Sequence, residues 1–345
     1  MSMFDQLVPF LFEVSDKTSL SLFNSSVALS TDLGLVREEN QDRVIFARVT
    51  PHGSYGPISL AIVSDGMGGM ASGGACATFA VAGFINALVT ERSSGSLAYS
   101  LEHAAHAANE AVFKEFGGKG GATLSVIAWC ADQDAFTLNV GDSRIYHQSE
   151  GFSGDLKRLT VDDTMSEAFG GNGKGLIQFM GLGEGLKPHV RSAPRKGVMF
   201  ATTDGIHFID PEFFAEVVRK ASTPKSKADR VTALARWLGG PDNASIAVVD
   251  LDAFPQRAAT NGSLIELWSC GSGQSRVWMT PPSLPPPPAP PQPLHEVGKG
   301  KGASRKGQSK SAGKKRSSSK KAKAEAQGRL QIEVDVDEGT DADSE

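Results

Sequence analysis

Four aspartates in this sequence lie at the ends of short hydrophobic runs, next to Gly or a small polar residue. They are Asp65, Asp142, Asp204 and Asp242. A carboxylate in such a place usually caps a turn or the following helix, and each of the four could do only that. Four of them, together with Asp32 and Asp42 in one acidic stretch, are harder to dismiss. Strand ends can meet in space, and clustered carboxylates repel one another unless a cation lies between them.

Such a cluster favours one kind of chemistry. Mg²⁺ and Mn²⁺ bind oxygen ligands and take a few carboxylates while keeping several waters. Two such ions about 4 Å apart can activate a bridging water and stabilise a phosphoryl transition state. Glycines beside the carboxylates, such as Gly66 and Gly205, allow backbone and metal to approach closely. The pattern therefore predicts a divalent-metal site suited to phosphate hydrolysis.

The elements that would position these aspartates are short strands and two groups of helices. Runs rich in β-branched and aromatic residues predict strands at 43–49, 58–64, 124–129, 135–140, 143–147, 197–202 and 245–251. Apolar residues recur at helical spacing over 77–88 and 101–116, and further helices are expected at 211–220 and 227–238. Because the helices come in groups rather than alternating with strands, the order favours an α+β fold with largely antiparallel pairing.

Seven motifs in one order give a resemblance to a known family. They are TDLGLVREENQD (31–42), VSDGMGGMASG (63–73), GATLSVIAW (121–129), LNVGDSRIYH (138–147), LTVDD (159–163), TTDGI (202–206) and PDNAS (241–245). Each alone is weak, but together they resemble the type-2C metal-dependent protein phosphatases (PPM family) in their bacterial serine/threonine form, over roughly residues 25–252. The resemblance implies a central antiparallel β-sandwich flanked by α-helices, in α-β-β-α layers.

The resemblance also implies metal ligands. Asp65 would bridge two Mn²⁺ or Mg²⁺ ions, and the carbonyl of Gly66 would bind one of them. Asp204 and Asp242 would complete the coordination shell of the first ion. Asp42 would either bind the metal directly or contact one of its ligands.

Three further residues match positions around that centre. Asp142, with Asp204, matches a third and weaker metal site of bacterial members. Arg37 matches the arginine that holds the substrate phosphate, and a guanidinium fork suits phosphate oxygens. Asn243 would orient solvent or phosphate.

The implied reaction is direct attack of a metal-bound water on phosphoserine or phosphothreonine. Phosphorylated proteins would be the substrates, and the enzyme, as a monomer, would counteract a bacterial Ser/Thr kinase. Only 16 residues, 164–179, stand where typical bacterial members carry a longer flap over the site, so the resemblance implies a more open cleft.

Two other readings compete with the phosphatase. Residues 66–71 fit the G-x-G-x-x-G/A pattern of a dinucleotide site, but Asp65 would face the pyrophosphate, and Glu91 closes a helix instead of ending a second strand. The other alternative is a catalytically inactive PPM-fold scaffold that acts through an interaction tail. The sequence retains Asp65, Asp204, Asp242 and Arg37, which argues against it.

Composition divides the chain into parts. The 345 residues carry a net charge of −4, but residues 281–293 hold 9 of the 18 prolines and residues 299–323 hold 11 basic side chains. Such segments lack the apolar content to pack. We expect an N-terminal extension at 1–22, the phosphatase domain at 23–252, a hairpin-like element at 253–280 and a disordered tail at 281–345. The tail could bind a protein or an acidic partner, or act as a solvated spacer.

The same composition excludes several classes of protein. No apolar stretch reaches the ~20 residues of a membrane span. The N-terminus lacks the basic start of a secretory signal, and the three cysteines form no C-x-x-C pair. These features predict a cytoplasmic protein.

Overall fold

The computed structural model describes residues 2–49, 57–67, 72–90, 96–130, 134–149, 154–171, 173, 175–255 and 265–277. They belong to one compact unit, Met1–Leu284. The predicted tail at 281–345 lies outside the described residues, as do Glu91 and most of the glycine-rich stretch after Met67.

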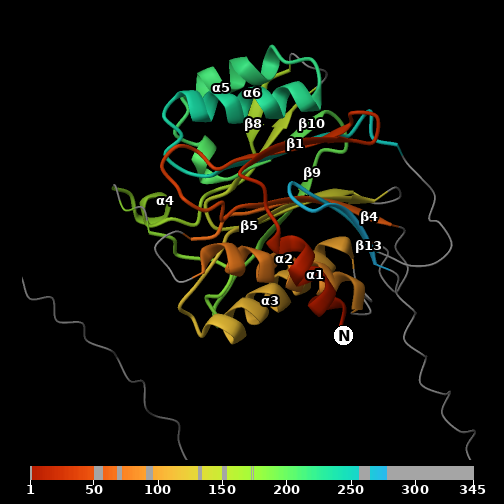
Figure 1. Ribbon diagram of the computed structural model, residues 1–345, viewed down its shortest axis with the longest axis vertical. Helices are drawn as coiled ribbons and strands as arrows, with labels where there is room; N and C mark the ends of the chain where they lie inside the picture. Colours follow the sequence, from red (N-terminus) through yellow and green to blue (C-terminus); the bar gives the residue numbers. More distant parts are fainter. Residues whose placement is uncertain are drawn as a thin grey trace, which may run out of the picture. The chain divides into compact units, whose positions relative to one another are not determined.

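Two antiparallel sheets form the centre of this unit (Figure 1). In the described residues, the first has the order β1 (Lys17–Leu22), β2 (Val27–Asp32), β11 (Ala244–Asp250), β10 (Val198–Thr202), β7 (Arg144–Gln148) and β8 (Leu156–Arg158). The second has the order β13 (Gly273–Val277), β12 (Ile265–Ser269), β3 (Arg43–Val49), β4 (Ile58–Ser64), β5 (Leu124–Cys130), β6 (Ala135–Val140) and β9 (His189–Ala193).

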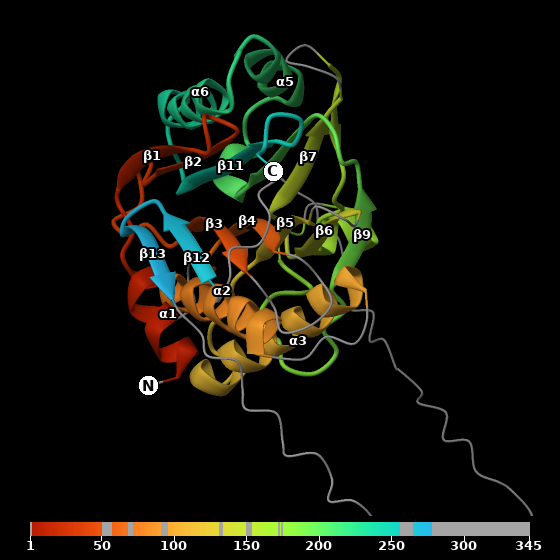
Figure 2. The same cartoon turned by 90° about the vertical axis from the view of Figure 1, so that its right-hand side faces the viewer.

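Helices cover the outer face of each sheet (Figures 1 and 2). α5 (Pro211–Arg219) and α6 (Pro224–Trp237) lie on the first sheet, whereas α1 (Met3–Phe12), α2 (Gly73–Thr90) and α3 (Leu97–Phe116) lie on the second. A short helix, α4 (Met165–Phe169), and a 3₁₀ turn, η1 (Asp204–Ile206), complete the set among the described residues. The predicted α+β sandwich in α-β-β-α layers is confirmed.

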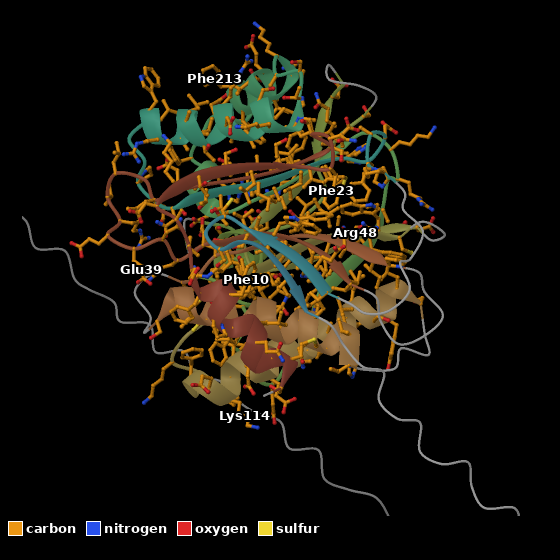
Figure 3. The ribbon with its side chains drawn as sticks, turned by 45° about the vertical axis from the view of Figure 1, so that its right-hand side comes forward. Phe10, Phe23, Glu39, Arg48, Lys114 and Phe213 are labelled. Atoms are coloured by element: carbon orange, nitrogen blue, oxygen red, sulfur yellow. The ribbon has the colours of Figure 1, made fainter. Side chains whose placement is uncertain are left out.

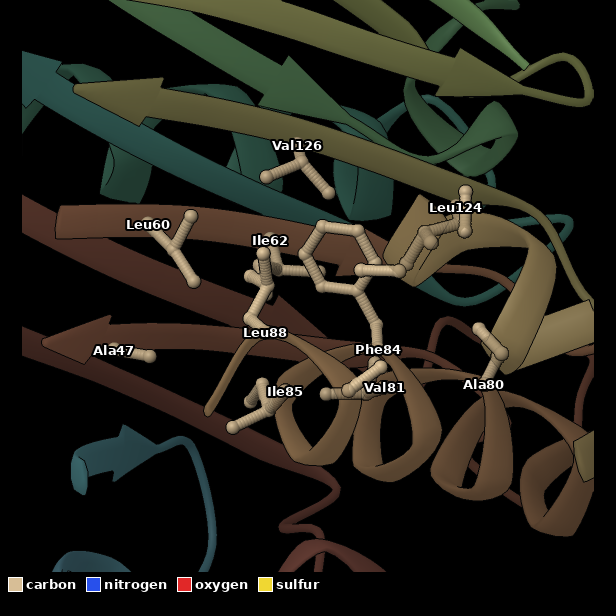
Figure 4. Packing of buried hydrophobic residues seen from close by; sticks show 14 of the residues in the cluster. Ala47, Leu60, Ile62, Ala80, Val81, Phe84, Ile85, Leu88, Leu124 and Val126 are labelled. Carbon is tan, nitrogen blue, oxygen red and sulfur yellow. The ribbon is translucent and has the colours of Figure 1, made fainter. Parts of the chain in front are cut away.

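The layers are held together by three buried clusters of hydrophobic side chains. Between the sheets, the ring of Phe23 packs edge-on against Phe46 and Trp268, with ring centroids 5.1 and 4.9 Å away (Figure 3). Under α2, Phe84 points into the second sheet among Leu60, Ile62 and Val126 (Figure 4). The third cluster joins α5 and α6 to the first sheet. These contacts fix the positions of the strands and so of the loops at their ends.

One helix in the described residues, α2, is long and apolar enough to cross a membrane by length and composition alone. Of that helix, 78% is buried inside the protein. Burial of this extent is typical of the core helix of a globular domain.

Both ends of the domain contribute to these layers. α1 begins with a capping box between Ser2 and Asp5, and its Leu7 and Leu11 are buried in the cluster under α2. Residues 265–277 form the hairpin of β12 and β13, and β12 pairs with β3, so that the hairpin extends the second sheet. The domain boundaries expected from the sequence stay a prediction.

Candidate metal and phosphate site

The residues predicted to form the site come together at one end of the two sheets. In the second sheet, Asp42 directly precedes β3 and Asp65 directly follows β4, and the two strands pair with Arg43 opposite Ser64. Antiparallel pairing thus sets the two aspartates side by side, although 22 residues separate them in the chain.

The first sheet delivers its residues to the same end. Asp204 begins η1 after β10, and Asp242 and Asn243 precede β11, which pairs with β10 through Thr202 and Ile246. Asp142 lies in the turn between β6 and β7, so it joins the two sheets at this edge.

Burial and mutual repulsion perturb the carboxyl groups of the site. Asp42 is 2% exposed, and loss of hydration raises its pKa to about 7, with the charges of Asp204 and Asp242 acting in the same direction. Burial, followed by the charge of Asp204, also raises the pKa of Asp142 to about 7. The pKa of Asp65 is raised well above its usual value, first by burial and then by Asp204. These shifts show that the carboxyls face one another in a poorly hydrated place.

Two observations on the carboxylate oxygens test whether the cluster fits a cation. The carboxyls of Asp65 and Asp204 lie within hydrogen-bonding reach of each other, so they must share a proton or a positive ion. Asp42 Oδ1 is buried without a hydrogen-bond partner, whereas its Oδ2 accepts a hydrogen bond of 2.8 Å from the Thr203 hydroxyl. An unpartnered carboxylate oxygen and a carboxyl pair in contact form a donor set that a hard divalent ion prefers.

The carboxylates of the cluster do not converge on one common position. In the part of the chain that the structure describes, no group of three or more His, Cys, Asp or Glu side chains is arranged to hold a metal ion as it stands. The donor set fits a divalent ion by its chemistry, and the assignment of individual ligands stays a prediction.

Arg37 lies at the rim of the cluster and is turned towards Asp242. Its Nη2 donates to Asp242 Oδ2 at 2.6 Å, with the two side chains 40% and 28% exposed. That hydrogen bond, with the charges of Asp242, Asp204 and Asp65, raises the pKa of Arg37. The guanidinium therefore remains charged and half-exposed, as a group that meets an anion at the mouth of the site would be.

Asn243 has a part in building the site. Its Oδ1 accepts from the backbone N–H of Gln41 at 2.8 Å, and its Nδ2 donates to the carbonyl of Leu33 at 2.9 Å. Both bonds hold the 33–42 loop, which carries Arg37 and Asp42, against the start of β11. In the structure, Asn243 thus positions that loop.

Glycines make this close packing possible. A Cβ on Gly66 would lie 2.2 Å from the carbonyl oxygen of Gly73, at the start of α2. A Cβ on Gly205 would lie 1.9 Å from the carbonyl oxygen of Asn243. Both distances are far below van der Waals contact, so the two motifs require glycine where the loops meet.

Several residues of the region have roles that sequence reasoning did not assign. Thr203 holds Asp42, and its position between a buried strand and Asp204 was the only signal for it. Arg144 and Arg158 both donate to the carboxylate of Asp162. Asp32, a candidate from the acidic stretch, forms an ion pair with Arg236 instead. The distance between Arg236 Nη1 and Asp32 Oδ1 is 2.7 Å.

Neither a protein-family model nor a curated protein sequence matches the chain. Solved structures do. The serine/threonine phosphatase PstP/Ppp of Mycobacterium tuberculosis is 25% identical, with a TM-score of 0.54 over 65% of this chain and 97% of that one. The catalytic domain of PstP in complex with two manganese ions is 27% identical, with a TM-score of 0.53 over 65% and 96% of the two chains. The PPM Ser-Thr phosphatase MsPP from Mycobacterium smegmatis, in complex with cacodylate, is 23% identical, with a TM-score of 0.54 over 67% and 99%.

The two PstP neighbours match 65% of this chain and nearly all of their own length, and they share the fold that the seven motifs imply. In fold and in the order of its motifs, the chain is similar to the bacterial PPM-type serine/threonine phosphatases.

Proposed function

We propose that the chain is a metal-dependent protein serine/threonine phosphatase whose site is the aspartate cluster at the end of the sandwich. One observation carries the proposal: Asp42, Asp65, Asp142 and Asp204 come from four different loops and are held together although burial, and then mutual repulsion, raises the pKa of each. Such an arrangement costs stability in a metal-free protein, so a role in binding cations explains it best.

Each residue of the cluster would have a distinct role in binding the metal ions. Asp65, Asp204 and Asp242 would hold Mn²⁺ or Mg²⁺, with the Gly66 carbonyl and Asp42 beside them, and Asp142 with Asp204 would serve a third ion. When bound, such ions supply positive charge to a phosphoryl group and lower the pKa of water. The manganese-bound PstP neighbour supports this choice of metal.

Arg37 would bind the substrate phosphate. Its hydrogen bond to Asp242 uses one of five N–H donors of the guanidinium, which leaves others for phosphate oxygens at the open side of the site. Asn243 and Thr203 would keep the 33–42 loop and Asp42 in place while the substrate binds. The leaving Ser or Thr side chain would face solvent across the short 164–179 segment.

The wider biological role is also a proposal. We infer that the substrates are phosphoproteins and that a Ser/Thr kinase supplies them, in the cytoplasm, with the phosphatase acting as a monomer. The catalytic domain would span 23–252, and the tail from 281 would contact a protein or an acidic partner.

The test is hydrolysis of p-nitrophenyl phosphate and of a phosphothreonine peptide, with and without Mn²⁺. Asp65→Asn and Asp204→Asn should each lower turnover at least about 100-fold, because each removes a charge on which metal binding depends. Asp229→Asn is the matched control, since Asp229 lies on α6 and pairs with Lys225 away from the site. Equal, metal-independent background rates for wild type and both site variants would favour the inactive scaffold.

A further inference from the structure

A cavity lies between the first sheet and the start of the helix α5 that covers it. It has a volume of about 240 Å³ and is bounded by β7 and β8 on one side and by η1 and the start of α5 on the other. Figure 2 shows β7 leading towards α5 in this region. Its lining includes Arg144, Arg158, Tyr146, Ile206, His207 and Phe214.

The polar end of the cavity carries a net positive charge. Arg144 and Arg158 share one carboxylate, Asp162, through bonds of 2.7 and 2.5 Å, and their side chains are 24% and 29% exposed. Two guanidinium groups and one carboxylate leave one positive charge. Both arginines also lower the pKa of His207, after burial, so the imidazole is neutral and adds no charge of its own.

One donor at this end lacks a partner. Among the described residues, Arg158 Nε is a buried nitrogen with no hydrogen bond. A buried unpaired donor on a cation destabilises the protein, and a charge-assisted hydrogen bond to an anion would recover much of that loss. The cavity thus has a donor that the protein itself does not satisfy.

The other end is apolar and partly aromatic. The rings of Tyr146 and Phe214 pack against each other at an interplanar angle of 58°, with centroids 5.3 Å apart, and Ile206 and Ile209 are 2% and 3% exposed. Aromatic and aliphatic walls of this kind suit a flat hydrophobic body. A single negative charge on such a body would match both ends of the cavity.

We propose that this cavity binds a small aromatic carboxylate, with its anionic group on Arg158 and Arg144 and its ring between Phe214 and the isoleucines. The wall formed by Ile206 and His207 continues directly from Asp204 through η1. A ligand in the cavity therefore contacts the same turn that presents Asp204 to the aspartate cluster. Binding itself does not depend on the phosphatase assignment.

The test uses the full chain with isoleucine methyl groups labelled for NMR, and benzoate as the probe. Benzoate should shift the methyl signals of Ile206 and Ile209 in a saturable way. Benzamide, the uncharged counterpart, should bind at least about tenfold more weakly, because a charge-assisted hydrogen bond contributes about 1.5–3 kcal/mol. Inorganic phosphate, which has charge but no ring, should also bind more weakly than benzoate.

Three variants sharpen the test. Arg158→Gln should weaken benzoate binding at least about tenfold, and Ala215→Phe, which fills the cavity without changing its charge, should abolish it. Arg191→Gln is the control, because Arg191 is exposed on β9 of the other sheet. The proposal is overturned if benzoate causes no saturable shift, if benzamide or phosphate binds as well, or if folded Arg158→Gln and Ala215→Phe bind benzoate like the wild type.

Discussion

Replacement of Asp42 by Asn should stabilise the metal-free protein at alkaline pH, although it removes a group of the proposed site. Asp42 is 2% exposed, and burial raises the pKa of its carboxyl from 3.8 to about 7. Each unit of that shift corresponds to about 1.4 kcal/mol, so keeping the group ionised above pH 7 costs the folded state up to about 4 kcal/mol. The amide introduced by Asp42→Asn carries no charge and avoids this cost.

The substitution also has a cost of its own. Asn can still accept the hydrogen bond from the Thr203 hydroxyl, but its NH₂ group would replace Oδ1, which has no partner. A buried donor without a partner costs about 1–3 kcal/mol. The net gain in the free energy of unfolding is therefore about 1–3 kcal/mol at pH 8. It should shrink as the pH falls through 7 towards 3.8, because Asp42 becomes protonated and uncharged in the folded and then in the unfolded protein.

Urea unfolding in EDTA at pH 8 and near pH 4 measures both effects. Asp229→Asn, an exposed carboxylate on α6, should change stability by less than about 1 kcal/mol at either pH. With saturating Mn²⁺ at pH 8 the order should reverse, since the wild type gains more from metal binding than Asp42→Asn does. The reasoning fails if Asp42→Asn is no more stable than the wild type in EDTA at pH 8, or if its advantage is the same at both pH values.

Three other changes test separate parts of the structure. Arg37→Lys should lower kcat/KM for p-nitrophenyl phosphate at least about tenfold with little change in stability, because an ammonium lacks the planar fork; unchanged kinetics would remove Arg37 from phosphate binding. Burial lowers the pKa of Lys227 from 10.5 to about 8, so wild-type stability should rise between these pH values as the amine loses its proton, and urea curves of Lys227→Met should lack that rise. Gly205→Ala should cost about 3 kcal/mol or more in denaturant unfolding, since its Cβ would lie 1.9 Å from a carbonyl oxygen. Gly175→Ala, with its nearest atom at 3.8 Å, should cost less than about 1 kcal/mol.

Most of the central strands could be predicted because burial governs them, but β2 was not predicted although it is buried throughout. β3, β4 and β6 have the predicted bounds, and nearly every residue of β3 and β4 is buried. The edge strands β1 and β9 escaped prediction, because their residues are mostly exposed or half-buried and carry no clear apolar pattern. Such strands form because a neighbouring strand offers hydrogen bonds, which a local window of sequence does not contain.

The sequence predicts which residues come together near the site, but it predicts the contacts among them only in part. Aspartates at strand ends are visible in the sequence, and antiparallel pairing brings them to one edge. Which aspartate meets which partner depends on contacts across the chain. Asp32 looked like a member of the cluster but is paired with Arg236, 204 residues away, whereas Asp65 contacts Asp204. Local sequence carries no information about such pairs.

The aspartate cluster destabilises the metal-free folded protein, and this loss of stability is the strongest argument that the cluster binds a cation. At Asp162 the protein supplies the compensating charges itself, because this buried carboxylate pairs with Arg144 and Arg158. Among the described residues, Asp42 and Asp65 form no such ion pair, and burial raises the pKa of both. The loops around them are held by the Gln41 N–H, which donates to Asn243 Oδ1, and by the Thr203 hydroxyl, which donates to Asp42. These hydrogen bonds hold the loops together, so the repulsion between the carboxyls persists until protons or cations bind. At neutral pH, a carboxyl with a pKa of about 7 exchanges its proton readily for a divalent ion, and the same burial that raises the pKa strengthens the attraction for the ion. The fold thus holds the charge in place for a ligand that the polypeptide does not itself supply.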